Sequence, residues 1–207
     1  MGQKYKLLLF DMDGVLIDSK KNMELSWSAV QSTFELNIHF DKYFELIGRP
    51  FNDIMAELGL SDQADKIKSV YDVASSCRVD LIDIYSDCID VVKKIKEMGV
   101  RIGVVTSKDE TRTLEIIKML DVLFDVIECP NAKSRGKPSP DPIFRAMLKC
   151  QMDPFDTVYI GDMDVDMKAA NRAGIDYIHA DWGYGNCISD VMKASKPDDI
   201  LKLISKT

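Results

Sequence analysis

Two aspartates, Asp11 and Asp13, directly follow the apolar run at residues 7–10, with one residue between them. Alternate residues of an extended chain point to the same side, so both carboxylates can reach one ligand. Two carboxyl groups at one centre suit nucleophilic attack by one and proton transfer by the other. Gly14 allows a positive φ and a close approach of the backbone to that ligand. Taken alone, such a pair is more often two solvated acids in a turn. The other segments of the chain must decide between this interpretation and a catalytic pair.

A hydroxyl stands at the end of a second apolar run, at residues 101–105. The Thr106 hydroxyl and the backbone N–H groups of Ser107 and Lys108 can hold a phosphoryl oxygen near the start of a helix. The alternative is that Thr106 or Ser107 is only the N-cap of the helix expected over 109–120.

Lys137 lies in a segment rich in glycine and proline, residues 135–142. A stiff loop of this kind can hold an ammonium group at a defined place. Most lysines are solvated surface residues, which is the competing interpretation.

Asp162 and Asp166 follow a further apolar run, at residues 158–161. They are one helical turn apart, so both can face the same point. The Asp-x-Asp-x-Asp spacing resembles the start of an EF-hand loop, but Met167 and Ala173 stand where that loop requires glycine and glutamate, which excludes a calcium loop. The remaining alternative is that these acids only cap a helix.

The elements that must position these residues alternate along the second half of the chain. Helical patterns at 88–98, 110–120, 141–149, 165–173 and 198–205 alternate with strand patterns at 101–105, 126–128, 157–160 and 177–179. Such alternation predicts an α/β fold, a Rossmann-like parallel sheet with helices on both faces. The carboxyl ends of its strands share one edge, where ligands bind. The candidate residues are therefore expected to meet there.

Residues 20–83 break this alternation, because their apolar residues recur at helical spacing and no strand is predicted among them. We expect residues 19–84 to form a small helical cap domain, inserted into a discontinuous core of residues 1–18 and 85–207. The cap would act as a lid over the site. Arg49, between Gly48 and Pro50, is expected to project from it and bind an anionic leaving group, unless it is a surface arginine.

Composition narrows the classes of partner. The chain has 207 residues and a formal net charge of −7, which argues against nucleic acid or an anionic membrane. No apolar stretch is long enough to span a bilayer, and the first strand leaves no room for a signal peptide. Five scattered cysteines without a Cys-x-x-Cys pair indicate reduced thiols. We expect a cytoplasmic protein, a monomer or a weak dimer, that binds a small molecule.

The four polar segments together resemble the motifs of the haloacid dehalogenase superfamily, in its phosphoglycolate phosphatase and β-phosphoglucomutase branch. Residues 11–19 are similar to the first motif, Thr106 to the second, Lys137 to the third, and residues 161–166 to the fourth. Their order and approximate spacing agree over the full length. Two shorter segments, residues 48–50 and 182–185, are similar to phosphoglycolate-phosphatase-like members.

The resemblance implies a Mg²⁺-dependent phosphatase that hydrolyses a small phosphorylated metabolite, phosphoglycolate-like or a sugar phosphate, through an aspartyl phosphate. Asp11 would attack phosphorus, and Asp13 would protonate the leaving alkoxide and later activate water. Mg²⁺ would be held by Asp11, the backbone carbonyl of Asp13 and Asp162, with Asp166 supporting it indirectly.

The resemblance also implies that Lys137, Thr106 and Ser107 stabilise the phosphoryl oxygens. Two alternatives stay open. One is a phosphomutase of the β-phosphoglucomutase type; Gly161 favours a hydrolase, because such mutases often carry Glu-Asp at the fourth motif. The other is a non-catalytic phosphate-binding protein, against which the intact set of acids argues.

Overall fold

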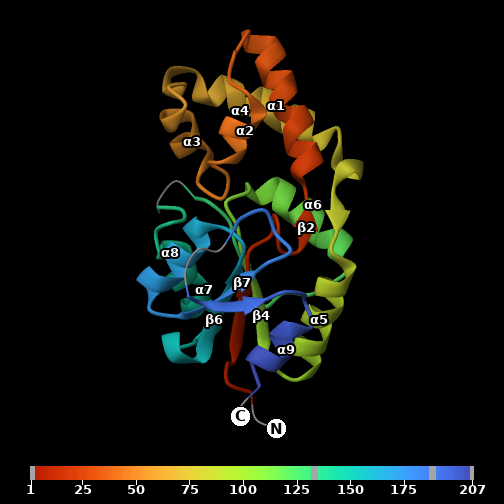
Figure 1. Ribbon diagram of the computed structural model, residues 1–207, viewed down its shortest axis with the longest axis vertical. Coiled ribbons are helices and arrows are strands. Elements are labelled where there is room, and N and C mark those ends of the chain that lie inside the picture. Colours follow the sequence, from red (N-terminus) through yellow and green to blue (C-terminus); the bar gives the residue numbers. More distant parts are fainter. Residues whose placement is uncertain (1–2, 132–134, 187–189, 206–207) are drawn as a thin grey trace.

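A parallel sheet forms the centre of the computed structural model, which describes residues 3–131, 135–186 and 190–205 (Figure 1). Its six strands lie in the order β5-β4-β1-β6-β7-β8, and each neighbouring pair is parallel. The strands are β1 (Leu7–Phe10), β4 (Arg101–Val105), β5 (Val126–Glu128), β6 (Thr157–Gly161), β7 (Asp176–Ala180) and β8 (Met192–Ala194). The predicted Rossmann-like α/β class is confirmed.

The central strand β1 explains why the polar segments meet. It lies between β4 and β6, so that Phe10 pairs with Val104 on one side and with Ile160 on the other. All of β1 is buried, as expected for a strand covered on both faces. Because the three strands are parallel and in register, the residues that follow them emerge at one edge.

Helices cover both faces of the sheet (Figure 1). The core helices are α5 (Ser86–Glu97), α6 (Glu110–Leu120), α7 (Asp141–Cys150), α8 (Asp164–Ala173) and α9 (Asp199–Leu203). Leu8 and Phe10 share a buried cluster with side chains of α5, α6 and α9, whereas Leu7 and Leu9 pack with α7 and α8. This alternation is the two-residue period of a strand.

The N-cap of α6 tests whether Thr106 or Ser107 only caps that helix. Its N-cap is Asp109, whose side chain accepts a hydrogen bond of 3.1 Å from the backbone N–H of Arg112. Aspartate is among the residues best suited to this position. The interpretation of Thr106 or Ser107 as a plain N-cap is therefore wrong.

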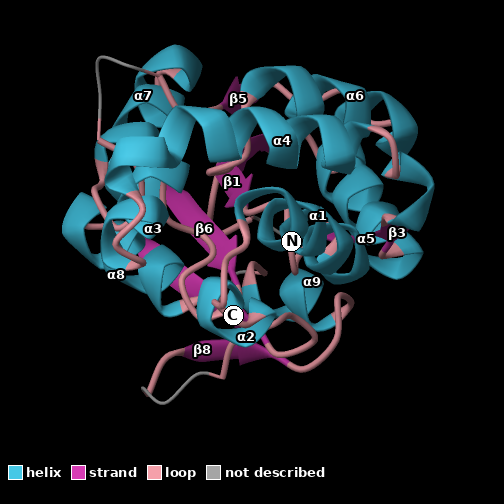
Figure 2. Ribbon diagram, turned by 90° about the horizontal axis from the view of Figure 1, so that it is seen from above, coloured by secondary structure: helices cyan, strands magenta, loops and turns pink. Residues whose placement is uncertain are grey.

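Above the strand ends lies a helical unit with its own hydrophobic cluster (Figures 1 and 2). Its elements are α1 (Lys20–Phe34), α2 (Phe40–Phe44), α3 (Phe51–Glu57), α4 (Ala64–Ser76) and the 3₁₀ turns η1 (Ser61–Gln63) and η2 (Val79–Leu81). Trp27 and Tyr43 stack at its centre, with ring centroids 4.5 Å apart. We call this unit the cap; the predicted domain bounds, 19–84, stay a prediction.

Short elements escaped sequence-based prediction. β2 (Ile17–Asp18) and β3 (Asp83–Ile84) form an antiparallel pair where the chain leaves and re-enters the core. The expectation that residues 20–83 contain no strand is therefore wrong at Asp83. The strand β8 and the turn η3 (Pro154–Asp156) were also missed. Elements of two or three residues are too short to show a period. Within the described ranges, no helix combines the length and apolar character needed to cross a membrane.

Candidate active site

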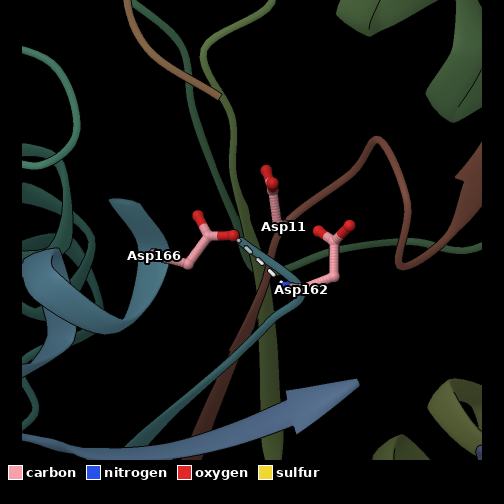
Figure 3. Close-up of side chains that lie close together, drawn as sticks. All are labelled: Asp11, Asp162 and Asp166. Carbon is pink, nitrogen blue, oxygen red and sulfur yellow. Dashed lines mark hydrogen bonds between the residues drawn. The ribbon is translucent and has the colours of Figure 1, made fainter. Parts of the chain in front are cut away.

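Three carboxylates converge at the strand ends (Figure 3). Asp11 follows β1 and Asp162 follows β6, while Asp166 lies in the first turn of α8. Each offers an oxygen, and these oxygens lie within 4.8 Å of one another. All three side chains are buried. The convergence predicted from the sequence for these residues is therefore present, and the interpretation of Asp11 as a solvated turn acid is wrong.

Lys137 reaches into this carboxylate cluster, although it comes from the loop before α7. Its Nζ lies 2.8 Å from Asp11 Oδ1, 2.7 Å from Asp166 Oδ1 and 3.2 Å from Tyr159 Oη. An ammonium group has three donors, and each here has an acceptor. Although burial opposes the charge, the two carboxylates raise the pKa of Lys137 above its ordinary value. The surface-lysine interpretation is wrong, because Lys137 is only 1% exposed.

Tyr159 is a site residue that sequence reasoning missed. Its Oη donates to the carbonyl of Val105 at 2.9 Å, which leaves the oxygen free to accept from Lys137. Burial raises its pKa well above the ordinary value. The sequence feature that could have identified it is a tyrosine inside an apolar strand, because a buried tyrosine hydroxyl needs a polar partner.

Asp166 and Asp162 differ in how their oxygens are used. Asp166 Oδ1 contacts Lys137, and its Oδ2 accepts from the backbone N–H groups of Asp162 (the dashed line in Figure 3) and Met163, at 3.3 and 3.0 Å. Asp166 thus also caps α8, as the capping alternative expected. Asp162 Oδ2 accepts from the backbone of Tyr184 at 2.7 Å, whereas its buried Oδ1 has no hydrogen-bond partner among the described residues.

The cluster carries more negative charge than the protein neutralises. Burial raises the pKa of Asp11 to about 7; Lys137 opposes this rise, and the Asp166 carboxylate adds to it. Burial, followed by the charges of Asp166 and Asp11, raises the pKa of Asp162. Buried carboxylates require compensation by a cation or a proton. Converging carboxylates, one of which keeps a buried oxygen without a partner among the described residues, fit a hard divalent cation such as Mg²⁺.

Glycines allow two loops to pack closely on Asp162. Gly14 has a φ of +87°, as predicted, and a Cβ there would lie 2.2 Å from Asp162 Oδ2. A Cβ on Gly183 would lie 2.2 Å from Asp162 Cβ. Side chains at these positions would therefore displace the carboxylate.

Asp13 is held differently from Asp11. Its Oδ1 accepts a hydrogen bond from the hydroxyl of Ser19 and lies 3.2 Å from Lys108 Nζ. Lys108 is itself largely buried, so this ion pair is shielded from solvent. The carboxyl group of Asp13 is thus oriented by one hydroxyl and one ammonium.

A small cavity of about 70 Å³ separates the core from the cap. Core and cap contribute comparable parts of its wall. The core residues are Asp11, Asp13, Thr106, Ser107, Lys108, Arg112 and Met163, and the cap residues are Met23, Tyr43, Ile47, Gly48, Arg49, Phe51, Ile54 and Tyr71. Lys137, Asp162 and Asp166 are not among the lining residues.

The remaining predicted residues all line this cavity. Thr106 is buried, and its Oγ1 accepts from the backbone N–H of Lys108 at 3.1 Å. The Ser107 hydroxyl donates to the carbonyl of Gly48 in the cap at 2.6 Å, so it joins core and cap. Arg49 is about one third exposed and lies 3.9 Å from Glu57, too far for a hydrogen bond.

Comparison with known proteins places these features in a family. Residues 8–180 match the model of the haloacid dehalogenase-like hydrolases. A phosphoglycolate phosphatase of Aquifex aeolicus is 26% identical, over 96% of this chain and 96% of its own. Pyrophosphatase PpaX of Halalkalibacterium halodurans is 29% identical, over 94% and 91%.

A solved structure shares the fold. It is that of a candidate phosphoglycolate phosphatase of Lactobacillus plantarum, with a TM-score of 0.87, 24% identity, and coverage of 97% of this chain and 99% of that one. The resemblance noted from the four motifs is thereby confirmed. The chain belongs to the haloacid dehalogenase-like hydrolase family, in its branch of phosphatases.

Proposed function

We propose that this phosphatase is Mg²⁺-dependent and hydrolyses a small phosphorylated metabolite, phosphoglycolate-like or a sugar phosphate, through an aspartyl phosphate. The observation that carries the proposal is the position of Lys137, buried between the Asp11 and Asp166 carboxylates at 2.8 and 2.7 Å. A lysine placed there holds the nucleophile and supplies positive charge close to where the phosphoryl group would bind. The names of the two relatives, a phosphoglycolate phosphatase and a pyrophosphatase, support a small substrate.

The two motif-one aspartates have separate roles in the proposed reaction. An oxygen of Asp11 attacks phosphorus; the new P–O bond forms as the bond to the leaving group breaks. Asp13 gives its proton to the leaving oxygen and takes one from the water that later hydrolyses the phosphoenzyme. Both residues line the cavity, and the contacts of Asp13 with Ser19 and Lys108 orient it.

Charge on the transferred group is stabilised by groups fixed in advance. We assign this role to Lys137, Thr106 and the backbone N–H of Ser107. Bound Mg²⁺ would neutralise negative charge on the phosphoryl group and the nucleophile. Asp11, the Asp13 backbone carbonyl and Asp162 are its proposed ligands.

The support for this ligand set comes from the hydrogen bonds. Asp162 keeps one buried oxygen without a partner among the described residues, whereas both oxygens of Asp166 accept from the protein. Asp166 would therefore hold Lys137 and the loop after β6 in place, instead of binding the cation directly.

The phosphomutase alternative is less well supported. Gly161 stands where such mutases often carry glutamate, and a Cβ there would lie 2.5 Å from Asp166 Cβ. A larger residue therefore does not fit the present packing. A non-catalytic phosphate-binding protein would not require the buried cluster of Asp11, Lys137 and Asp162. We also infer a cytoplasmic location; the oligomeric state, monomer or weak dimer, stays a prediction.

The test is a screen of phosphorylated metabolites ranked by kcat/KM, with inorganic phosphate release measured in Mg²⁺ and in EDTA. We expect Mg²⁺-dependent release, together with a phosphoenzyme that is detectable by intact mass after acid quench and absent from Asp11→Asn. Isomerisation of a hexose 1-phosphate in the presence of its bisphosphate, without net phosphate release, would favour the mutase. No turnover of any ester would overturn the proposal.

A further inference from the structure

The wall of the cavity between core and cap holds more cationic than anionic side chains. Arg49, Lys108 and Arg112 line it, together with the acids Asp11 and Asp13. Lys108 is paired with Asp13. The other two cations of the wall are Arg49 from the cap and Arg112 from the core.

Arg112 is the more rigidly held of the two arginines. Its side chain is 14% exposed, and its Nε binds the Asp109 carboxylate at the start of α6. The guanidinium lies over the ring of Tyr71, 5.5 Å from the centroid, which is a cation–π distance. Among the described residues, its Nη1 has no hydrogen-bond partner. One edge of a fixed, charged fork therefore has no protein partner among the described residues.

Asp72, on cap helix α4, contacts Arg112 from the cap side. Its Oδ1 lies 3.4 Å from Arg112 Nη2, and this buried oxygen has no hydrogen bond within the part of the chain that the structure describes. Its Oδ2 binds Lys68 of the same helix. The contact between Asp72 and Arg112 is thus a charge contact without a hydrogen bond, which an incoming anion can replace.

We propose that Arg112 is a specificity residue that binds an anionic group on a short leaving group, and that Asp72 competes with this group for the guanidinium. The inference rests on the proposed phosphatase function and narrows its substrate class. The leaving group must carry a carboxylate or a second phosphate, because a guanidinium fork pairs best with such groups. It must also be short, because Arg112 and the proposed nucleophile Asp11 line the same small cavity.

The competing explanation is a purely structural ion pair, in which Arg112 and Asp72 only hold core and cap together. Removing either partner would then weaken the same contact. Both variants would change kcat/KM in the same direction, and equally for charged and neutral substrates. The specificity role predicts opposite directions, which makes the two explanations separable.

The experiment compares 2-phosphoglycolate with its carboxamide, which has the same shape without the charge, on the full-length enzyme in Mg²⁺. The measured quantity is the ratio of the two kcat/KM values. Arg112→Met should lower this ratio about 10- to 100-fold, as expected for a lost charged hydrogen bond. Asp72→Asn should raise it by roughly three- to tenfold, and should have no effect in the Arg112→Met background.

Two variants serve as controls. Arg135→Met removes the same charge from an exposed arginine that pairs with Asp141 outside the cavity, so the ratio should stay constant. Arg112→Lys keeps the charge and loses the fork, and should give an intermediate ratio even if Arg112→Met folds poorly. A thermal melt of each variant reports folding separately.

The outcomes distinguish this inference from the proposed function. If the wild type hydrolyses both probes with an equal kcat/KM, or if Asp72→Asn lowers the ratio as Arg112→Met does, the specificity role is overturned and the phosphatase stands. If no phosphate ester is hydrolysed in Mg²⁺, the proposed function fails and this inference fails with it.

Discussion

The backbone N–H of Tyr184 donates to Asp162 Oδ2 at 2.7 Å, so the loop after β7 holds the carboxylate that ends β6. The side chain of Tyr184 points to the cap. Its Oη donates to Asp18 Oδ1 at 2.9 Å and accepts from the backbone N–H of Ser19 at 2.7 Å, just before α1. Its ring meets that of Phe44 in α2 edge-on, at 5.2 Å. One residue therefore joins the carboxylate cluster to the base of the cap.

Tyr184→Phe removes only the hydroxyl and leaves the backbone contact with Asp162. We expect the free energy of unfolding to fall by about 1–3 kcal/mol, because the buried Ser19 N–H loses its acceptor. Hydrogen exchange should become faster in the first turn of α1. The control is Tyr85→Phe, since the Tyr85 hydroxyl has no hydrogen bond among the described residues. Unchanged exchange in α1 would contradict the anchoring role.

Asp11→Asn should abolish turnover while the fold is kept. An amide of the same shape cannot act as the anionic nucleophile, so kcat should fall by at least about three decades, or about 4 kcal/mol of barrier. Steady-state kinetics with a generic aryl phosphate, together with a circular dichroism melt, measure this. Activity within tenfold of wild type would remove Asp11 from the nucleophile role.

Asp162→Ala should greatly raise the Mg²⁺ concentration needed for half-maximal activity, and extra substrate should not restore the rate. A calorimetric Mg²⁺ titration without substrate tests the same point independently of turnover. Calcium should inhibit the wild type, because its larger and looser shell misplaces the attacking carboxylate. An unchanged Mg²⁺ titration of the variant would show that Asp162 only supports the fold.

Arg49→Ala tests the contribution of the cap to substrate selection. If Arg49 pairs with an anionic leaving group, the ratio of kcat/KM for an anionic-tailed ester to that for a neutral aryl phosphate should fall by about one to three decades. Equal losses of kcat/KM on both esters would indicate that Arg49 binds the transferred phosphate or stabilises the cap. A constant ratio with normal rates would make Arg49 a surface residue.

His179 should make the fold less stable in mild acid. It lies buried in β7, and burial lowers its pKa below 6.5, with the nearby Asp181 opposing this shift. The folded state then binds fewer protons than the unfolded state below pH 6.5, so the free energy of unfolding falls as the pH falls through that value. Urea titrations of wild type and His179→Gln measure this effect. As the pH falls from 7.5 to about 5, the free energy of unfolding of the variant should rise relative to that of wild type. The exposed His39, changed to Gln, is the control; a pH-independent difference for His179→Gln would refute the prediction.

Much of the fold follows from local sequence patterns. The bounds of β4, β5 and α6 were predicted to the residue, because the two-residue and 3.6-residue periods of buried side chains are properties of the segment itself. Parallel strands that alternate with helices must end at one edge. The sequence thus determined that Asp11, Thr106 and Asp162 meet there.

The tertiary structure decided which of these residues touch and what surrounds them. A loop of glycine and proline does not specify where Lys137 points; burial between two carboxylates at 2.8 and 2.7 Å depends on how α7 and α8 pack on the sheet. The contact of Arg112 with Asp72 exists only because the cap lies over α6. Such pairs join segments far apart in the chain, and their geometry is set by the packing of whole elements, which no local period records.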